Sequence, residues 1–144
     1  EVDQLYEEDV GPYVEPVPVA DFVNAINEGR GVVLVQGHGP CEADFMIPPG
    51  SLDDLFVTGD VGTLENNYML PFIWIGAPYI GNFQIDVTFP EAWLRVRHAS
   101  GDPIGAIAVY ASSVDLDYAS THAAQYDMVN LLVKSSPLFK RVRG

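Results

Sequence analysis

"FQIDVTFPEAWLRVRH", residues 83–98, contains the clearest periodic pattern in the chain. In its first half, four apolar residues alternate with polar ones: Phe83, Ile85, Val87 and Phe89. Its second half alternates in the same way from Leu94 to His98. Alternation with a period of two is typical of a half-buried β-strand. We therefore expect two strands, over residues 83–89 and 94–98.

The connection between these two strands is constrained by Pro90. A two-residue hairpin turn needs a positive φ at its first position, which proline cannot adopt, so we expect a four-residue loop over residues 90–93. Apolar side chains must then face apolar ones across the pair. This register places Asp86 opposite Arg97 on the outer face, and it places His98 on the buried face.

The segment that follows, "IGAIAVYAS" over residues 104–112, is apolar on both faces, as a central strand would be. It completes three consecutive antiparallel strands over residues 83–112. The chain also has 11 prolines and 13 glycines in 144 residues, which indicates many turns. We predict a mainly β fold, an antiparallel sandwich or jelly-roll-like barrel with short peripheral helices. The alternative is an α+β sheet covered by the C-terminal helix.

Shorter patterns predict the remaining elements. We expect strands over residues 32–36, 42–47 and within the apolar run 69–80, and helices over residues 22–29, 51–56 and 121–134. Asp21 can cap the first of these helices, and Gly29 would end it. The apolar run is too short to span a bilayer, so it is interpreted as a buried strand and no membrane partner is expected.

The charge of the chain predicts a division into three parts. The formal net charge is −13, which argues against binding to nucleic acids or anionic membranes. Five acidic residues lie among the first nine residues, and four of the seven basic residues lie among the last eleven. We predict an extended acidic arm over residues 1–19, one β-rich domain over 20–136 and a basic tail over 137–144. Only this basic tail could contact nucleic acid.

The loop "GHGPCEADF", residues 37–45, carries His38 and the only cysteine of the chain, Cys41. A cysteine nucleophile needs a nearby cation or a helix N-terminus to stabilise its thiolate. Glu42 and Asp44 have the opposite effect, because they are negatively charged. We therefore predict that Cys41 lies in a polar turn and does no chemistry, and that Cys41→Ser leaves function unchanged. Nucleophilic catalysis by Cys41 with His38 is the less favoured alternative.

No cofactor or metal is expected. The chain has no CxxC, HExxH or paired-histidine spacing and no EF-hand pattern. Asp115 and Asp117 lie two positions apart and could form a carboxylate pair of the kind glycosidases use. Capping and turn roles are the commoner ones for these residues and for three acidic residues in predicted turns: Asp53, Asp54 and Asp60.

Trp93, Arg95 and Arg97 form the only cluster of basic and aromatic residues in the predicted domain. They could bind a carboxylate or a sugar, although pairing of the arginines with Asp86 is favoured. A glycan-binding platform could also be built from three aromatic residues: Trp74, Tyr79 and Trp93.

The favoured functional hypothesis is a non-enzymatic structural or interaction subunit of a larger assembly, such as a capsid, decoration or tail protein of a virion. An acidic, proline-rich arm cannot form a core of its own, so a partner should hold it. We expect that partner to be another copy or another subunit, in an extracellular particle. The predicted interaction residues are Glu7, Glu8, Val14, Val17, Val19, Lys140, Arg141 and Arg143. The alternatives are a β-sandwich ligand- or glycan-binding domain, and a hydrolase that uses Cys41 and His38 or paired carboxylates.

Overall fold

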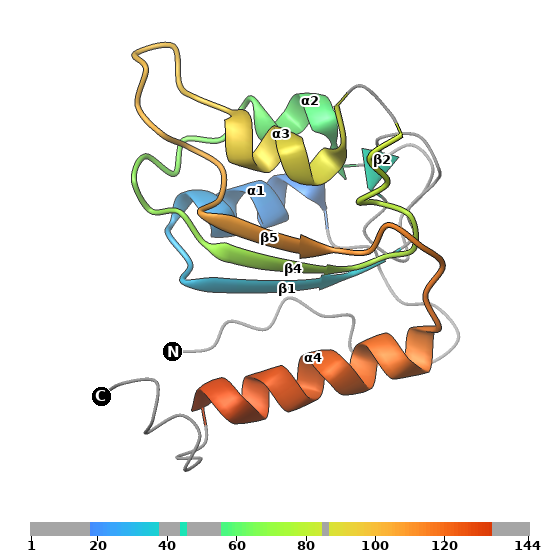
Figure 1. The fold of residues 1–144 in the computed structure, drawn as a ribbon. Coiled ribbons are helices and arrows are strands. Elements are labelled where there is room, and N and C mark those ends of the chain that lie inside the picture. The colour runs from blue at the N-terminus through green and yellow to red at the C-terminus, as the bar shows by residue number, and fades with distance from the viewer. Residues whose placement is uncertain (1–17, 38–43, 46–55, 85–86, 134–144) are drawn as a thin grey trace.

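The computed structural model of the chain describes residues 18–37, 44–45, 56–84 and 87–133 (Figure 1). The elements run in the order α1 (Val19–Asn27), β1 (Val32–Gln36), β2 (Asp44–Phe45), β3 (Phe56–Val57), α2 (Thr58–Val61), β4 (Phe72–Gly76), α3 (Phe89–Arg95), β5 (Ala108–Ala111) and α4 (Tyr118–Val133). Among these described helices, none is long and apolar enough to cross a membrane.

The main sheet has three parallel strands in the order β1-β4-β5. Leu34 on β1 lies opposite Trp74 on β4, which in turn lies opposite Tyr110 on β5. Helices α1 and α3 lie on one side of this sheet and α4 lies on the other (Figure 1). The runs "VVLVQ" in β1 and "FIWIG" in β4 are almost wholly apolar, which is typical of parallel strands covered on both faces. The fold is therefore α/β.

The predicted antiparallel sandwich or jelly-roll-like barrel is wrong, and the α+β alternative is wrong as well. Parallel pairing of β4 with both of its neighbours overturns these predictions. In the described part of the chain, the antiparallel pair of strands is β2 with β3, and each of these strands has only two residues. The mistake arose from residues 83–98, which fold differently.

Residues 89–95 of that segment form helix α3 instead of a strand and a loop. The helix begins at a capping box: the Glu91 backbone N–H donates to Thr88 Oγ1 (3.3 Å), and the Thr88 backbone N–H donates to Glu91 Oε2 (2.9 Å). Pro90 lies in the first turn, where its missing N–H costs nothing. Phe89 and Trp93 are four residues apart and both are buried, so they form the inner face of this helix.

The predicted hairpin therefore does not exist. Asp86 lies outside the described residues, so its predicted pairing with Arg97 is not tested. Arg97 forms an isolated antiparallel bridge with Pro103, outside the named strands. His98 was expected on a buried face, but it is exposed, and its backbone N–H donates to Asp102 O (3.0 Å). The predicted strand over 104–112 is shorter and forms β5 (Ala108–Ala111).

The main core lies between the sheet and helices α1 and α3. Ile73 and Ile75 of β4 are each only 1% exposed and face this side. An aromatic cluster packs against them with ring centroids between 5.1 and 6.5 Å apart: Phe22, Phe56, Phe89 and Trp93. Edge-to-face contacts of this kind add to the free energy gained from area burial alone. This core fixes α1 and α3 on one face of the sheet.

Several of the other predicted elements are confirmed. The expected helix at 22–29 appears as α1, although it begins at Val19 after Pro18 and not at Asp21. The expected helix at 121–134 appears as α4. The strand at 32–36 is β1 with the predicted bounds, and the apolar run contains β4. Residues 51–55 of the remaining predicted helix, over residues 51–56, lie outside the described part.

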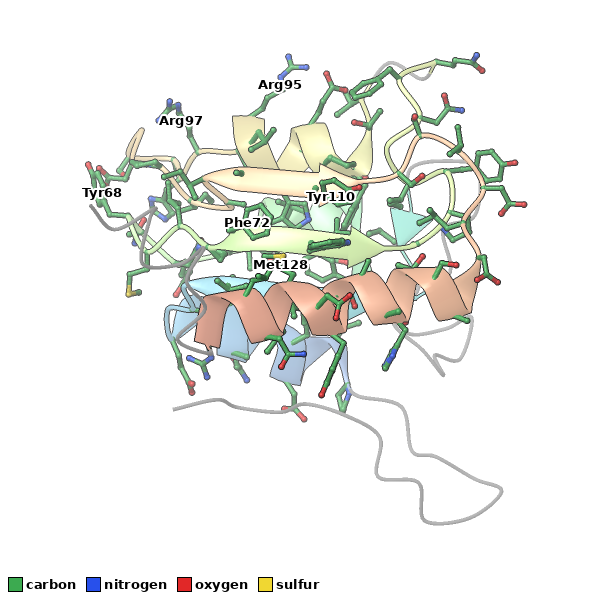
Figure 2. All side chains as sticks on the ribbon, turned by 60° about the horizontal axis from the view of Figure 1, so that its bottom comes forward. Tyr68, Phe72, Arg95, Arg97, Tyr110 and Met128 are labelled. Carbon is green, nitrogen blue, oxygen red and sulfur yellow. The ribbon has the colours of Figure 1, made fainter. Side chains whose placement is uncertain are left out.

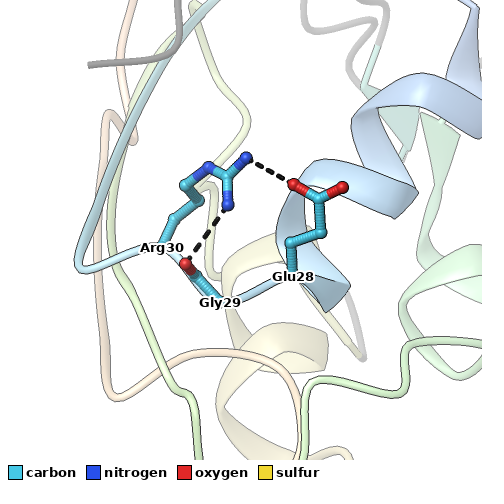
Figure 3. A network of polar contacts seen from close by, with 3 residues as sticks. All are labelled: Glu28, Gly29 and Arg30. Carbon is cyan, nitrogen blue, oxygen red and sulfur yellow. Dashed lines mark hydrogen bonds and ion pairs between the residues drawn. The ribbon is translucent and has the colours of Figure 1, made fainter. Parts of the chain in front are cut away.

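The connection from α1 to β1 turns at Gly29, as predicted. Gly29 adopts a φ of +87°, a left-handed conformation that glycine accepts without strain. Arg30 then folds back, and its guanidinium contacts Glu28 Oε2 (2.8 Å) and Gly29 O (3.3 Å) (Figure 3). Because Glu28 is exposed, this ion pair should contribute only about 0–1 kcal/mol.

Candidate functional site

In open sheets of parallel strands, ligands bind at the edge where the strands reach their carboxyl ends. In this protein the carboxyl edge is formed by the ends of β1, β4 and β5, at Gln36, Gly76 and Ala111. The backbone N–H of Gly37 donates to Gly76 O (3.3 Å) and holds the first two exits together. His38 follows Gly37 directly in the sequence. His38 and Cys41 themselves lie outside the described residues.

The loops that leave β4 and β5 are joined by backbone hydrogen bonds. The Tyr79 N–H donates to Val114 O (3.1 Å), and the Gly81 N–H donates to Ser112 O (2.8 Å). A Cβ atom on Gly81 would lie 3.2 Å from that same Ser112 oxygen, so the close approach favours glycine. Tyr79 has a φ of +58°, which costs a non-glycine residue on the order of 1–2 kcal/mol. The carboxyl edge is therefore formed by a fixed and locally strained backbone.

The first turns of α4 close this edge from one side. The Gln125 side chain donates from Nε2 to Val35 O (3.1 Å) and Trp74 O (3.3 Å), and its Oε1 accepts from Gln36 Nε2 (2.8 Å). Thr121 packs against Gly76, where an added Cβ would lie 2.7 Å from Thr121 Cγ2. These contacts fix the position of α4 relative to the exits of β1 and β4.

The acidic residues at this edge, Asp115 and Asp117, have structural roles, and so does Asp60 in α2. Asp117 Oδ2 accepts from the Ser120 N–H (2.9 Å) and Ser120 Oγ (2.7 Å), and these hydrogen bonds lower the pKa of Asp117. Asp115 Oδ1 accepts from the Leu116 N–H (3.0 Å). Asp60 caps α2 by accepting from the Val57 N–H (2.7 Å). The expected capping roles are confirmed for Asp60 and Asp117, while Asp53 and Asp54 lie outside the described residues.

The described part of the chain contains no group of three His, Cys, Asp or Glu residues that could hold a metal ion. The structure also does not bring together the predicted ligand site. Trp93 is only 1% exposed and lies in the core, whereas Arg95 and Arg97 are exposed on the side of the sheet opposite α4 (Figure 2).

The predicted glycan platform is dispersed in the same way. Trp74 is on the face of the sheet toward α4, Tyr79 is at the carboxyl edge, and Trp93 is on the opposite face. Of the predicted interaction residues, Val19 is described and is partly buried against the core. The other seven lie outside the described residues, and their predicted role is not tested: Glu7, Glu8, Val14, Val17, Lys140, Arg141 and Arg143.

Residues 1–135 match the family model of Peptidase family C25. This chain belongs to peptidase family C25. It is 31% identical over 126 residues to gingipain R2 and to gingipain R1 of Porphyromonas gingivalis. The match covers 87% of this chain but 16% of gingipain R2 and 12% of gingipain R1, so the chain spans about a sixth or less of these relatives.

Solved structures of the same family share the fold. The crystal structure of the Arg specific cysteine proteinase gingipain R (RGPB) superimposes with a TM-score of 0.70 at 30% identity, covering 84% of this chain and 26% of that one. The complex of Porphyromonas gingivalis RgpB pro- and mature domains also has a TM-score of 0.70 and 30% identity, with 27% of that chain covered. These similarities agree with the parallel α/β sheet described above.

Family membership corrects the main functional hypothesis. The chain is not a jelly-roll or virion structural protein, because it belongs to a peptidase family and has the gingipain-like α/β fold. The comparisons support the last alternative, a hydrolase of the cysteine-peptidase type. The sequence analysis weighed His38 as a partner of Cys41 but did not recognise that it follows a parallel strand, β1, after one intervening glycine. The sequence contains a pattern that could have revealed this: "VVLVQGH" is an apolar run, typical of a parallel strand, and it is followed by one glycine and then a histidine.

Proposed function

We propose that this chain is part of the catalytic domain of a C25-type cysteine peptidase, and that His38 acts as its general base. The observation that carries this proposal is the position of β1. This strand ends at Gln36, and the Gly37 N–H donates to Gly76 O at the end of β4, so the chain leaves the sheet at its carboxyl edge one residue before His38 in the sequence. Imidazole is the side chain best suited to exchange protons near neutral pH.

The reaction would proceed through an acyl-enzyme. His38 takes the proton of a cysteine thiol, and the thiolate forms a bond to the carbonyl carbon of the peptide. When the C–N bond breaks, the leaving amine takes the proton from the imidazolium. Water then attacks the thioester, releases the new carboxyl group and restores the thiol.

The thiol has one candidate within these 144 residues, Cys41, because the chain has a single cysteine. Cys41 lies three positions after His38 and is followed by Glu42. The prediction that Cys41 does no chemistry is still untested. If it is right, the nucleophile lies outside these 144 residues, which cover only 16% of gingipain R2.

The substrate class that we favour is a peptide with a basic residue at the cleaved bond. One solved relative is described as Arg specific. The net charge of −13 would also attract cationic peptides to this chain.

Hydrolysis of fluorogenic peptide amides with Arg, Lys or Ala before the cleaved bond tests the proposal in the whole protein. His38→Ala should lower kcat by at least about 100-fold, the usual contribution of a general base. His98→Ala is the matched control, because His98 is exposed and its ring Nδ1 contacts Ser100 in its own loop. Loss of hydrolysis in Cys41→Ser would show that Cys41 supplies the reacting thiol, and retained hydrolysis would show that it does not. Full activity in His38→Ala, or no hydrolysis of any of the three amides by the unmodified protein, would contradict the proposal.

A further inference from the structure

Two arginines at and just after the end of α3 have no carboxylate partner within the described residues, and we call them the arginine pair: Arg95 and Arg97. Carboxylates are abundant in this chain, which has a net charge of −13. Arg30, the other arginine in the described part, forms an ion pair with Glu28 (2.8 Å). Both members of the arginine pair are exposed, so their guanidinium groups remain available to an anion from outside the domain.

Two neighbouring carboxylates are engaged by other donors. Glu91 is four positions before Arg95, a spacing at which helical residues can form ion pairs, but its Oε2 accepts from the backbone in the capping box of α3 (2.9 Å). Asp102 lies next to Pro103, the bridge partner of Arg97, but its two carboxylate oxygens accept from hydroxyl groups at 2.7 and 2.9 Å. The local fold therefore directs these carboxylates to other groups and leaves the arginine pair open.

The backbone between the two arginines is fixed by the core. Val96 is extended (φ −63°, ψ 142°) and packs partly buried against the core. A Cβ atom on Gly105 would lie 2.5 Å from Val96 Cγ1, and the Gly105 N–H donates to the buried Asn66 Oδ1 (2.9 Å). Residues on either side of an extended residue point away from its side chain, and both arginines project from the face opposite α4 (Figure 2). Little backbone order is therefore lost when the arginine pair binds a ligand.

Arg97 also presents an unpaired backbone edge. It forms an antiparallel bridge with Pro103 in which the His98 N–H donates to Asp102 O (3.0 Å). In a non-hydrogen-bonded antiparallel pair of this kind, the N–H and C=O groups of the two opposed residues point away from each other. The Pro103 oxygen accepts from the Tyr68 N–H on its far side (3.0 Å), whereas the Arg97 N–H and C=O have no partner among the described residues. Arg97 is therefore the outer member of three paired segments.

We propose that this surface binds an extended acidic segment of another polypeptide, which pairs with the Arg97 edge as an added β-strand and places carboxylates on the arginine pair. Alternate residues of an extended chain share a face and lie about 7 Å apart, which matches two arginines that flank one extended residue. Guanidinium groups bind carboxylates through two parallel hydrogen bonds. A phosphate or sulfate ion could use the guanidinium groups but would leave the backbone edge unpaired, so the edge favours a peptide. The arginine pair lies where the loop from α3 leads to the start of β5 (Figure 1), so the proposal does not rest on the peptidase activity at the carboxyl edge.

Binding of a rhodamine-labelled peptide of alternating Glu and Val to the full chain tests the proposal by fluorescence anisotropy, in about 0.01 M salt, where the Debye length is about 30 Å. Arg97→Gln should raise the Kd at least about fivefold, and Arg95→Gln/Arg97→Gln at least about tenfold, because hydrogen bonds between charged groups are lost. Arg30→Gln is the matched control: it removes the same charge from an arginine that already pairs with Glu28, and it should change the Kd less than about twofold. A peptide of alternating Gln and Val should not bind.

Hydrogen exchange at the Arg97 amide separates an added strand from a simple anion. Saturating peptide should slow this exchange at least about tenfold, because the strand supplies the missing acceptor, whereas sulfate at equal ionic strength should leave it unchanged. Circular dichroism of the double variant should match that of the unmodified protein, which excludes unfolding as the cause of weaker binding. Equal binding by the double variant, or no saturable binding of the Glu peptide up to about 1 mM, would overturn the proposal. Equal protection of the Arg97 amide by peptide and by sulfate would also overturn it, because the surface would then hold anions only.

Discussion

At the scale of single residues, Asp117 shows how one side chain fixes the start of α4 at the carboxyl edge of the sheet. Its carboxylate accepts two hydrogen bonds from Ser120, and its carbonyl oxygen accepts from the Thr121 N–H (3.1 Å). Asp117→Ala should lower the free energy of unfolding by about 1 kcal/mol, the usual value of an N-cap. Urea titration at pH 7 measures this. Asp115→Ala is the control, since the described residues give the Asp115 side chain a single hydrogen bond, from the adjacent Leu116 N–H.

The same cap predicts a dependence on pH. Hydrogen bonds from Ser120 lower the pKa of folded Asp117 below its ordinary value of 3.8. A lowered folded pKa means that the stabilisation is complete above the unfolded pKa and is lost as the pH falls through the folded pKa. The difference between the unmodified protein and Asp117→Ala should therefore shrink below about pH 4. A difference that is equal at pH 7 and pH 2.5 would contradict this account of the cap.

Residues that cap helices or make buried polar contacts are only partly predictable from sequence. The predicted helix over residues 121–134 begins earlier, at Tyr118, and its cap is Asp117. Asn66 was not predicted at all. It is fully buried, donates from Nδ2 to Met69 O and Gly105 O, and accepts from the Gly105 N–H. Because Gly105 is 39 positions away, no local pattern could reveal this role.

At the scale of secondary structure elements, the contact between β4 and α4 predicts a specific steric effect. Gly76→Ala would place a Cβ atom 2.7 Å from Thr121 Cγ2, so α4 or the strand must shift. We expect a loss of about 1–3 kcal/mol, the usual cost of overpacking. Thermal or urea unfolding measures the effect.

A second substitution isolates this contact. Thr121→Ser removes Cγ2 but keeps the hydroxyl that donates to Asp117 O (2.9 Å). The double variant Gly76→Ala/Thr121→Ser should recover at least half of the loss, because the crowded methyl group is gone. If the two substitutions are simply additive, the close contact is not the cause of the destabilisation.

Helix α3 explains why an element prediction can fail on a clear pattern. The alternation over residues 83–98 predicted two strands, yet three of its apolar residues are exposed: Phe83, Val87 and Leu94. The buried residues Phe89 and Trp93 are instead four positions apart, which is the spacing of one face of a helix. The sequence contains the reason, since "TFPE" from Thr88 to Glu91 is a capping box with proline in the first turn. These helix-start signals outweigh an alternation that the core does not use.

At the scale of the whole molecule, topology could not be predicted because the strand pairs are distant in sequence. β1 pairs with β4, about 40 positions further along the chain, and no turn signal connects them. Their unbroken apolar character was visible, and it favours parallel strands over antiparallel ones. The position of His38 becomes informative only after the strands are known to be parallel, because only then do their carboxyl ends form one edge.

The net charge of −13 leads to a prediction that depends on the proposed function. Electrostatic steering raises the association rate of cationic substrates, and salt weakens it as the Debye length falls from about 30 Å at 0.01 M to about 3 Å at 1 M. For an Arg-containing peptide amide, kcat/KM should therefore fall several-fold between 0.01 and 0.5 M NaCl while kcat stays constant. An uncharged peptide amide should show no such change.

Asp115→Asn, at the exposed carboxyl edge, should reduce the salt dependence without lowering kcat. Equal salt dependence for charged and uncharged amides would refute steering, while leaving the role of His38 to its own test.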